Sequence, residues 1–282
     1  ASAPLNSAQY VHLTAEMEKR VFADRAQYLG DPDFVQIPLA QLRSALYLAR
    51  RAAEVDRARP TPLAQVKPGL DKGPANPMAS AEKPETTHYS VMDKWGNAVA
   101  NTYTLNGRFG SGVVVEGAGF LLNNEMDDFA AKAGVPNQFG VVGGDANTVQ
   151  PGKRPLSSMS PTIAVKDGKP ALVLGTPGGS RIFTAVYQVL VNVLDYRLPL
   201  AEAQAKARFH HQLLPDNVIY YEANRTPDLV AEDLRSRGWK LQDGLGGGGN
   251  IQAIELIGDM PIPVSDPRNI NGLALTVPVS VP

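Results

Sequence analysis

Residues 85–90, ETTHYS, separate two parts of the chain that differ in composition. Upstream, a proline-rich connector follows two helix-like segments. Downstream, apolar and polar residues alternate as in a β-strand. Thr is β-branched and suits the start of a strand, which is the simplest explanation for two threonines at this boundary. The alternative is that the chain is cut here and that Thr86 becomes an N-terminus, so the boundary decides both fold and function.

The part before the boundary is predicted to be helical. Apolar residues recur at helical spacing in residues 7–28, namely Tyr10, Leu13, Met17 and Val21. A second helix is expected to begin at Pro38 and to bury Leu39, Leu42, Leu46 and Ala53. Six prolines then break regular structure in residues 57–85, which we interpret as a linker.

The part after the boundary is predicted to hold most of the strands. The expected strands are residues 87–93, 98–105, 113–115, 119–122, 162–166, 170–174, 218–222 and 251–256. Asp167-Gly168 is a strong hairpin signal between two of them. The expected helices are 180–194, which is apolar almost all round, 200–208, and one from Thr226-Pro227 to Gly238. Strands followed by helices, with few βαβ repeats, indicate an α+β layered domain with antiparallel sheets.

The composition excludes several classes of protein. The chain has 282 residues, 43% hydrophobic and 20% charged, with a formal net charge of -1, as in an ordinary globular protein. We therefore expect no nucleic-acid partner. No apolar run approaches the roughly 20 residues that span a bilayer. The absence of cysteine excludes disulfides and a cysteine nucleophile and is compatible with the periplasm or the outside of the cell.

The first residues do not predict a targeting signal, and the glycine-rich loop does not predict a nucleotide site. Residues 1–13 lack the basic and apolar regions of a signal peptide, so we expect the chain to begin inside a larger or processed protein. Gly244, Gly246 and Gly249 match the dinucleotide spacing, but a strand-like segment follows where that motif needs a helix. We expect no cofactor.

The histidines do not predict a metal site. The chain has His12, His88, His210 and His211, and no pair has the i, i+4 spacing of ligands on one helix face. We expect no metal.

Three carboxylates and two serines admit two interpretations each. Glu125, Asp127 and Asp128 are either a solvated turn or a pocket for an ammonium group, since close carboxylates are costly to bury without a cation. Ser157 and Ser158 are either ordinary loop serines or hydroxyl donors for a carboxylate.

Gly178-Gly179 and Thr86 are the candidate chemical groups. The glycines precede the buried helix and form either a plain turn or a set of N–H donors for an oxyanion. The Thr86 hydroxyl needs a base to become a nucleophile. If the preceding bond were cut, the freed α-amine, with a pKa of about 7.7–8.0, would be that base. His88 lies two residues further along the same strand face, and a rise of roughly 3.3 Å per residue separates it from Thr86.

Several motifs together resemble the γ-glutamyltranspeptidases, a family of N-terminal-nucleophile hydrolases that includes glutaryl-cephalosporin acylases as near relatives. The resemblance is carried, in order, by TTHYSV, NTYTLN, LLNNEMDDF, GVPNQFGVVGGDAN, KRPLSSMSPTI, GTPGGSRI and RFHHQ. Residues 12–34 resemble the end of the family's large subunit, and SDPRN at 265–269 its closing motif. The resemblance covers nearly the whole chain except the residues after about 270.

The resemblance implies a four-layer αββα sandwich made as a precursor that cuts itself into two subunits. Residues 1–85 would be the end of the large subunit with its linker, residues 86–282 the small catalytic subunit, and the two would form a heterodimer within one domain. The implied site residues are Thr86 as nucleophile, with cleavage after Glu85; Thr104, which orients it; Gly178 and Gly179 as oxyanion hole; Asn106, Glu125 and Asp128 for the substrate ammonium; Ser157 and Ser158 for its carboxylate; and Phe139 on a lid, where many relatives have tyrosine.

The implied reaction is transfer of a γ-glutamyl group from glutathione, glutamine or related donors to water, an amino acid or a peptide. The resemblance further implies a periplasmic or extracellular location, as in bacterial members. It places the family's carboxylate-binding arginine in a part of the large subunit that this chain lacks. Two alternatives stay open: a glutaryl-cephalosporin acylase, which the acidic residues disfavour, and an uncleaved, non-catalytic homologue.

Overall fold

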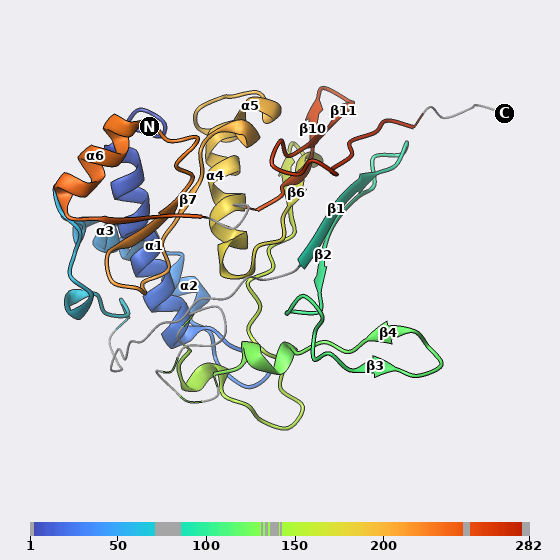
Figure 1. The fold of residues 1–282 in the computed structure, drawn as a ribbon, viewed down its shortest axis with the longest axis horizontal. Helices are drawn as coiled ribbons and strands as arrows, with labels where there is room; N and C mark the ends of the chain where they lie inside the picture. Colours follow the sequence, from blue (N-terminus) through green and yellow to red (C-terminus); the bar gives the residue numbers. More distant parts are fainter. Residues whose placement is uncertain are drawn as a thin grey trace.

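Two antiparallel sheets pack face to face in the computed structural model, which describes residues 3–70, 86–130, 132, 135, 141, 143–244 and 249–277. One sheet is the hairpin of β1 (Thr86–Met92) and β2 (Ala98–Thr104). The other has the strand order β11-β10-β6-β5. Its strands are β5 (Thr162–Lys166), β6 (Lys169–Gly175), β10 (Gln252–Ile257) and β11 (Met260–Ser265). In Figure 1 the hairpin lies beside β6 and β10.

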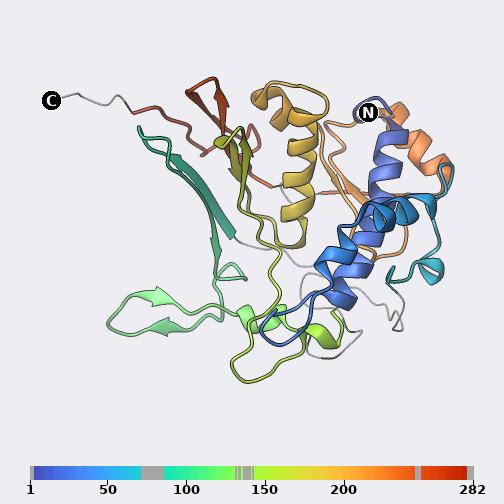
Figure 2. The same cartoon turned by 180° about the vertical axis from the view of Figure 1, so that it is seen from behind.

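A helical layer covers the other face of the four-stranded sheet. It consists of α4 (Ile182–Leu194) and α5 (Leu200–Ala205). The core between them contains Leu172, Leu174, Ala185, Val186, Val189, Leu200, Ala203, Ile251 and Ala253. Figure 2 shows the resulting sequence of layers, from the hairpin through the larger sheet to α4.

A second core joins the upstream segment to the C-terminal half of the chain. Here α1 (Ala8–Tyr28) packs against α6 (Asp228–Arg237) and the sheet β7-β8-β9. The strands are β7 (Phe209–His210), β8 (Val218–Tyr221) and β9 (Lys240–Asp243), with β8 and β9 parallel. Ala8, Tyr10, Val11 and Ala15 of α1 share this core with Phe209, Ile219, Leu234 and Trp239. Residues from both sides of the 85–86 boundary therefore form one hydrophobic core.

The remaining elements are short. They are α2 (Leu39–Leu42), α3 (Ala45–Ala53), the hairpin β3 (Val114–Val115) and β4 (Phe120–Leu121), and the 3₁₀ turns η1 (Leu63–Gln65), η2 (Glu125–Asp128), η3 (Asp145–Asn147) and η4 (Gly179–Arg181). No helix within the described ranges combines the length and apolar character needed to cross a membrane.

The predicted α+β class is confirmed, and the described residues supply three layers in the order helix, sheet, sheet. Within that part of the chain, no helix contacts the outer face of the β1–β2 hairpin closely enough to form a fourth layer. The expected burial of residues 180–194 is confirmed for most of α4, although Tyr187 and Leu194 are exposed.

Two upstream predictions are wrong. The helix from Pro38 is split, because the Ser44 hydroxyl accepts the Tyr47 N–H and begins a new helix. Leu39 and Leu46 are exposed, and α3 buries Tyr47 and Arg51 instead.

The described part of the predicted linker, residues 57–70, is held in place by hydrogen bonds. In residues 57–70, the Thr61 N–H and hydroxyl donate to Glu16, and the Gly69 N–H donates to Asp24 at 2.7 Å. Hydrogen bonds to α1 therefore hold the first half of this proline-rich stretch, which sequence composition alone did not indicate.

Candidate active site

Strand pairing brings two threonine hydroxyls together at one end of the β1–β2 hairpin. Thr86 and Thr104 are opposite each other in the register of the two strands. The Thr86 Oγ1 donates to Thr104 Oγ1 at 3.1 Å, and Thr104 Oγ1 also accepts the Asn106 N–H at 2.8 Å. Asn106 is buried with φ of 71°, a left-handed conformation that asparagine tolerates better than most residues. This turn fixes the oxygen that holds the Thr86 hydroxyl.

His88 does not act on Thr86. Its Nδ1 is 2.7 Å from the Thr102 hydroxyl and its Nε2 is 3.1 Å from the Ser90 hydroxyl, so both ring nitrogens have partners inside the sandwich. Burial lowers the pKa of His88 to about 4, which keeps the ring neutral near pH 7. A base for Thr86 therefore has to come from elsewhere.

The acidic turn η2 directs two of its three carboxylates inward. Asp127 is exposed and accepts a hydrogen bond from the Asn124 side chain at 2.8 Å. Glu125 and Asp128 are half-buried. Burial, a hydrogen bond with Glu125 and the negative charge of Glu125 raise the pKa of Asp128 to about 8. Such a pair binds a proton or another cation, which favours the interpretation as an ammonium pocket over that of a solvated turn.

The serine loop meets α1. Ser158 Oγ accepts a hydrogen bond from Arg25 Nη2 at 3.0 Å, whereas Ser157 is exposed and its Oγ accepts the Met159 N–H at 3.0 Å. Arg25 is a site residue that sequence reasoning missed. It lies in the last turn of α1, where a basic residue is ordinarily explained by the helix dipole, so its position carried no distinguishing signal.

The glycine turn before α4 has the strained backbone that only glycine adopts readily. Gly178 has φ of 145° and Gly179 φ of 57°. Behind the turn, the Ser180 hydroxyl donates to Gln212 Oε1 at 2.6 Å, and the same oxygen is 2.9 Å from His210 Nε2. Burial lowers the pKa of His210 to about 3, so this ring is also neutral. The contacts tie the turn to β7 and the segment that follows it.

A small cavity of about 20 Å³ brings most of the predicted site residues together. Its lining includes Thr86, Thr104, Asn106, Asp128, Ser157, Ser158 and Gly179, together with Arg25 and Met159. Glu125 and Gly178 do not line it, although each is close in sequence to a residue that does. Glu85 and Phe139 lie outside the described residues, so the predicted cleavage bond and lid position are not part of this geometry.

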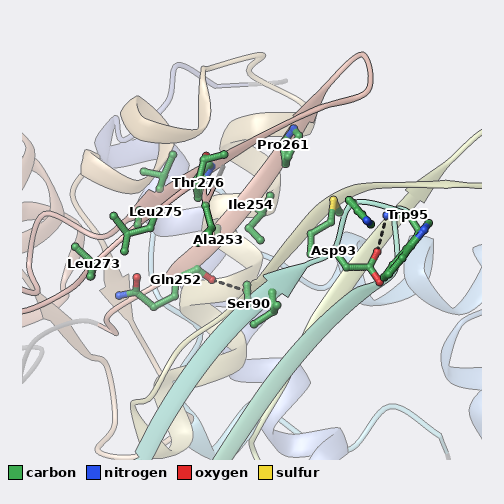
Figure 3. Close-up of a pocket in the computed structure, with 17 residues that line it drawn as sticks. Ser90, Asp93, Trp95, Gln252, Ala253, Ile254, Pro261, Leu273, Leu275 and Thr276 are labelled. Atoms are coloured by element: carbon green, nitrogen blue, oxygen red, sulfur yellow. Dashed lines mark hydrogen bonds between the residues drawn. The ribbon is translucent and has the colours of Figure 1, made fainter. Parts of the chain in front are cut away.

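A larger cavity of about 640 Å³ lies toward the other end of β1. Figure 3 shows it between β1, β10 and the segment with Leu273 and Leu275. Its lining is mainly apolar, and the Ser90 hydroxyl there donates to the Gln252 carbonyl. Nothing in this lining pairs a candidate nucleophile with convergent carboxylates, so we assign the candidate site to the smaller cavity on chemistry rather than on size.

Several known proteins are similar in sequence to this chain. The family model for γ-glutamyltranspeptidase matches residues 1–276. The chain belongs to this family. It is 57% identical over 274 residues to the glutathione hydrolase proenzyme of Pseudomonas aeruginosa, covering 97% of this chain and 47% of that protein. It is 49% identical over 272 residues to the Escherichia coli proenzyme of the same name, covering 95% of this chain and 44% of that protein. The chain thus spans about half the length of these curated relatives.

A solved relative matches a shorter part. A chain of γ-glutamyltranspeptidase from Pseudomonas nitroreducens, complexed with L-DON, has 58% identity and a TM-score of 0.66. The match covers 68% of this chain and 100% of that one. The whole of that chain is therefore matched by about two thirds of this one.

Proposed function

We propose that this chain carries the catalytic part of an enzyme that transfers γ-glutamyl groups to water, amino acids or peptides. The observation that carries the proposal is the position of the Thr86 hydroxyl. It is held by Thr104 at the start of β1, on a cavity that also contains Asp128, Ser158 and Gly179. A nucleophile, an anionic group, a hydroxyl donor and a glycine turn are the parts that acyl transfer from an α-amino acid requires.

The nucleophile is formed by cleavage of the chain. The precursor cuts itself between Glu85 and Thr86, which gives residues 1–85 as the end of a large subunit and 86–282 as a small one. Two facts support this step: the relatives above are named proenzymes, and the P. nitroreducens chain corresponds to only 68% of this one. The shared core of α1 with β7 and α6 would hold the two pieces together as a heterodimer.

The reaction then proceeds in two steps. The freed Thr86 α-amine takes the proton of the Thr86 hydroxyl as Oγ1 attacks the γ-carbonyl carbon. The backbone N–H groups of Gly178 and Gly179 stabilise the oxyanion. Collapse breaks the amide bond, and the leaving amine receives the proton. Water or an acceptor amine attacks the resulting ester by the reverse path and restores the Thr86 hydroxyl.

Recognition of the donor relies on its zwitterionic α-carbon. Asp128, Glu125 and Asn106 bind the ammonium group, and Ser157 and Ser158 donate to the carboxylate. Glutathione and glutamine carry this group. A glutaryl-cephalosporin acylase would leave the Glu125–Asp128 pair facing a substrate without an amine, which the cost of uncompensated buried charge disfavours.

The proposed location is the periplasm or the outside of the cell. The cysteine-free composition suits an oxidising compartment as well as a reducing one. Fractionation of the source cells with an activity assay on each fraction tests this assignment.

Substitution of Thr86 tests the proposed chemistry. In the full-length gene product, Thr86→Ala should abolish both cleavage and turnover of γ-glutamyl-p-nitroanilide. Thr86→Ser, which keeps a hydroxyl next to the α-amine, should retain both at a reduced rate. Turnover by the alanine variant at the wild-type rate would refute Thr86 as nucleophile. An uncut wild-type protein without turnover would support the non-catalytic alternative.

A further inference from the structure

Arg25 reaches the candidate site from the part of the chain upstream of the cleavage point. It belongs to the last turn of α1, while the other lining residues of the small cavity follow residue 85. Its Nη2 donates to Ser158 Oγ at 3.0 Å. Complementing the helix dipole would not require this contact, so the side chain has a second role to explain.

The hydrogen bond determines what Ser158 can do. A serine hydroxyl has one hydrogen and two acceptor lone pairs. Because Arg25 donates to the oxygen, the hydroxyl hydrogen is directed to another acceptor. A guanidinium at one side of Ser158 thus prepares the hydroxyl to donate to a carboxylate at the other side. Ser157 has a different arrangement, since its oxygen accepts a backbone N–H.

The charge of Arg25 also acts on Asp128. Among the described residues, the charged groups that influence Asp128 are Arg25 from α1 and Glu125 and Asp127 from η2. The two carboxylates favour the protonated form of Asp128, and Arg25 favours the anion. Burial lowers the pKa of Arg25 to about 10, so the guanidinium is still charged at neutral pH. Arg25 and Asp128 line the same small cavity.

We propose that Arg25 is a positioning residue for the donor: it orients the Ser158 hydroxyl toward the α-carboxylate and places a positive charge on the cavity that Asp128 also lines. The inference rests on the proposed function. It places one determinant of donor specificity in the upstream segment, on α1.

The test compares Arg25→Met and Arg25→Lys in the full-length gene product, with Arg43→Met as a control for loss of an exposed arginine. Two donors are assayed, γ-glutamyl-p-nitroanilide and glutaryl-p-nitroanilide, which lacks the amine. Arg25→Met should raise KM for the γ-glutamyl donor by about tenfold or more, as expected for loss of a charge-assisted hydrogen bond, with a much smaller change in kcat. The ratio of kcat/KM for the γ-glutamyl donor to kcat/KM for the glutaryl donor should fall. Arg25→Lys should recover most of the ratio, because it retains the charge.

Coupling to the two serines provides the second readout. The effect of Arg25→Met on KM should be strongly reduced in a Ser158→Ala background and unchanged in a Ser157→Ala background. An effect on kcat alone, or an effect on KM that is the same in the Ser158→Ala background as in wild type, would overturn the inference while the proposed function stands. Wild-type protein without Thr86-dependent turnover would instead overturn the proposed function. If Arg25→Met does not fold, Arg25→Gln takes its place, with the same expected rise in KM and the same loss of that effect in the Ser158→Ala background; a wild-type KM in Arg25→Gln overturns the inference.

Discussion

Among single residues, Asp128 has the side chain whose ionisation most directly controls the proposed binding of the donor's ammonium group. Its pKa is raised to about 8, so it holds a proton at pH 6 and releases it as the pH rises toward 8. Ammonium binding needs the anion. We therefore expect KM for a γ-glutamyl donor to fall between pH 6 and 8, by up to about tenfold per pH unit.

Asp128→Asn isolates this effect. The variant should have a high KM that no longer changes with pH over the same range, while kcat still follows titration of the Thr86 α-amine. Steady-state kinetics at closely spaced pH values measure both. The same slope of KM in Asp128→Asn and wild type would assign the titration to another group.

For single residues, the sequence predicted well which side chains belong to the candidate site, but it predicted poorly which residues they contact. Thr86, Thr104, Asp128 and Ser158 were expected, and strand register and turn geometry bring them to one cavity. Arg25 could not be expected, because its role depends on where the end of α1 lies relative to a loop more than 130 residues away in sequence. No local sequence pattern indicates that Arg25 and Ser158 lie close together.

At the level of secondary-structure elements, β6 and β1 of the two packed sheets approach each other closely at Gly175 and His88. A Cβ on Gly175 would lie 2.2 Å from the His88 ring, which its hydrogen bonds to Thr102 and Ser90 hold in place. Gly175→Ala should therefore destabilise the protein by about 1–3 kcal/mol, as overpacking of a core does. Urea denaturation of the purified variant measures the loss. In a His88→Ala background the same change should cost much less, and an equal cost there would exclude the ring as the cause.

Elements with strong local signals were predicted and those without them were not. The long helix α1, the buried helix α4 and the hairpins β1–β2 and β5–β6 have clear periodicity or turn residues. The short strands β7, β9 and β11 have neither, since β7 has two residues, β9 is mostly polar, and β11 contains two prolines. They form because neighbouring strands offer them partners, which only the tertiary structure specifies.

For the molecule as a whole, α1 ties the upstream segment to the rest of the fold, and Glu18 is part of that connection. Its carboxylate is buried and accepts the His211 N–H at 2.9 Å, while its Oε1 has no hydrogen-bond partner within the described part of the chain. Burial raises the pKa of Glu18 well above its ordinary value. A raised pKa means that the contribution of Glu18 to stability is present in acid and is lost as the pH rises through the folded-state pKa.

Glu18→Gln removes this titration. The melting temperature of the variant minus that of wild type should increase from pH 5 to pH 8, by about 2 to 4 °C for each kcal/mol of the ionisation penalty. Burial also lowers the pKa values of His88, His210 and His211, so these histidines destabilise the fold at pH values below the ordinary pKa of histidine. The effect is present in both proteins, so it cancels in the difference between their melting temperatures. A difference independent of pH, measured by calorimetry, would show that Glu18 does not titrate on unfolding.

The central claim is that Thr86 becomes an N-terminal nucleophile. Intact-mass analysis of the full-length gene product, before and after brief mixing with a γ-glutamyl donor, tests it most directly. We expect a polypeptide that begins at Thr86 and that gains the mass of one γ-glutamyl group on mixing, with the group located on Thr86 by fragmentation. An uncut chain that still hydrolyses the donor, or an acyl group on any other residue, would contradict the account.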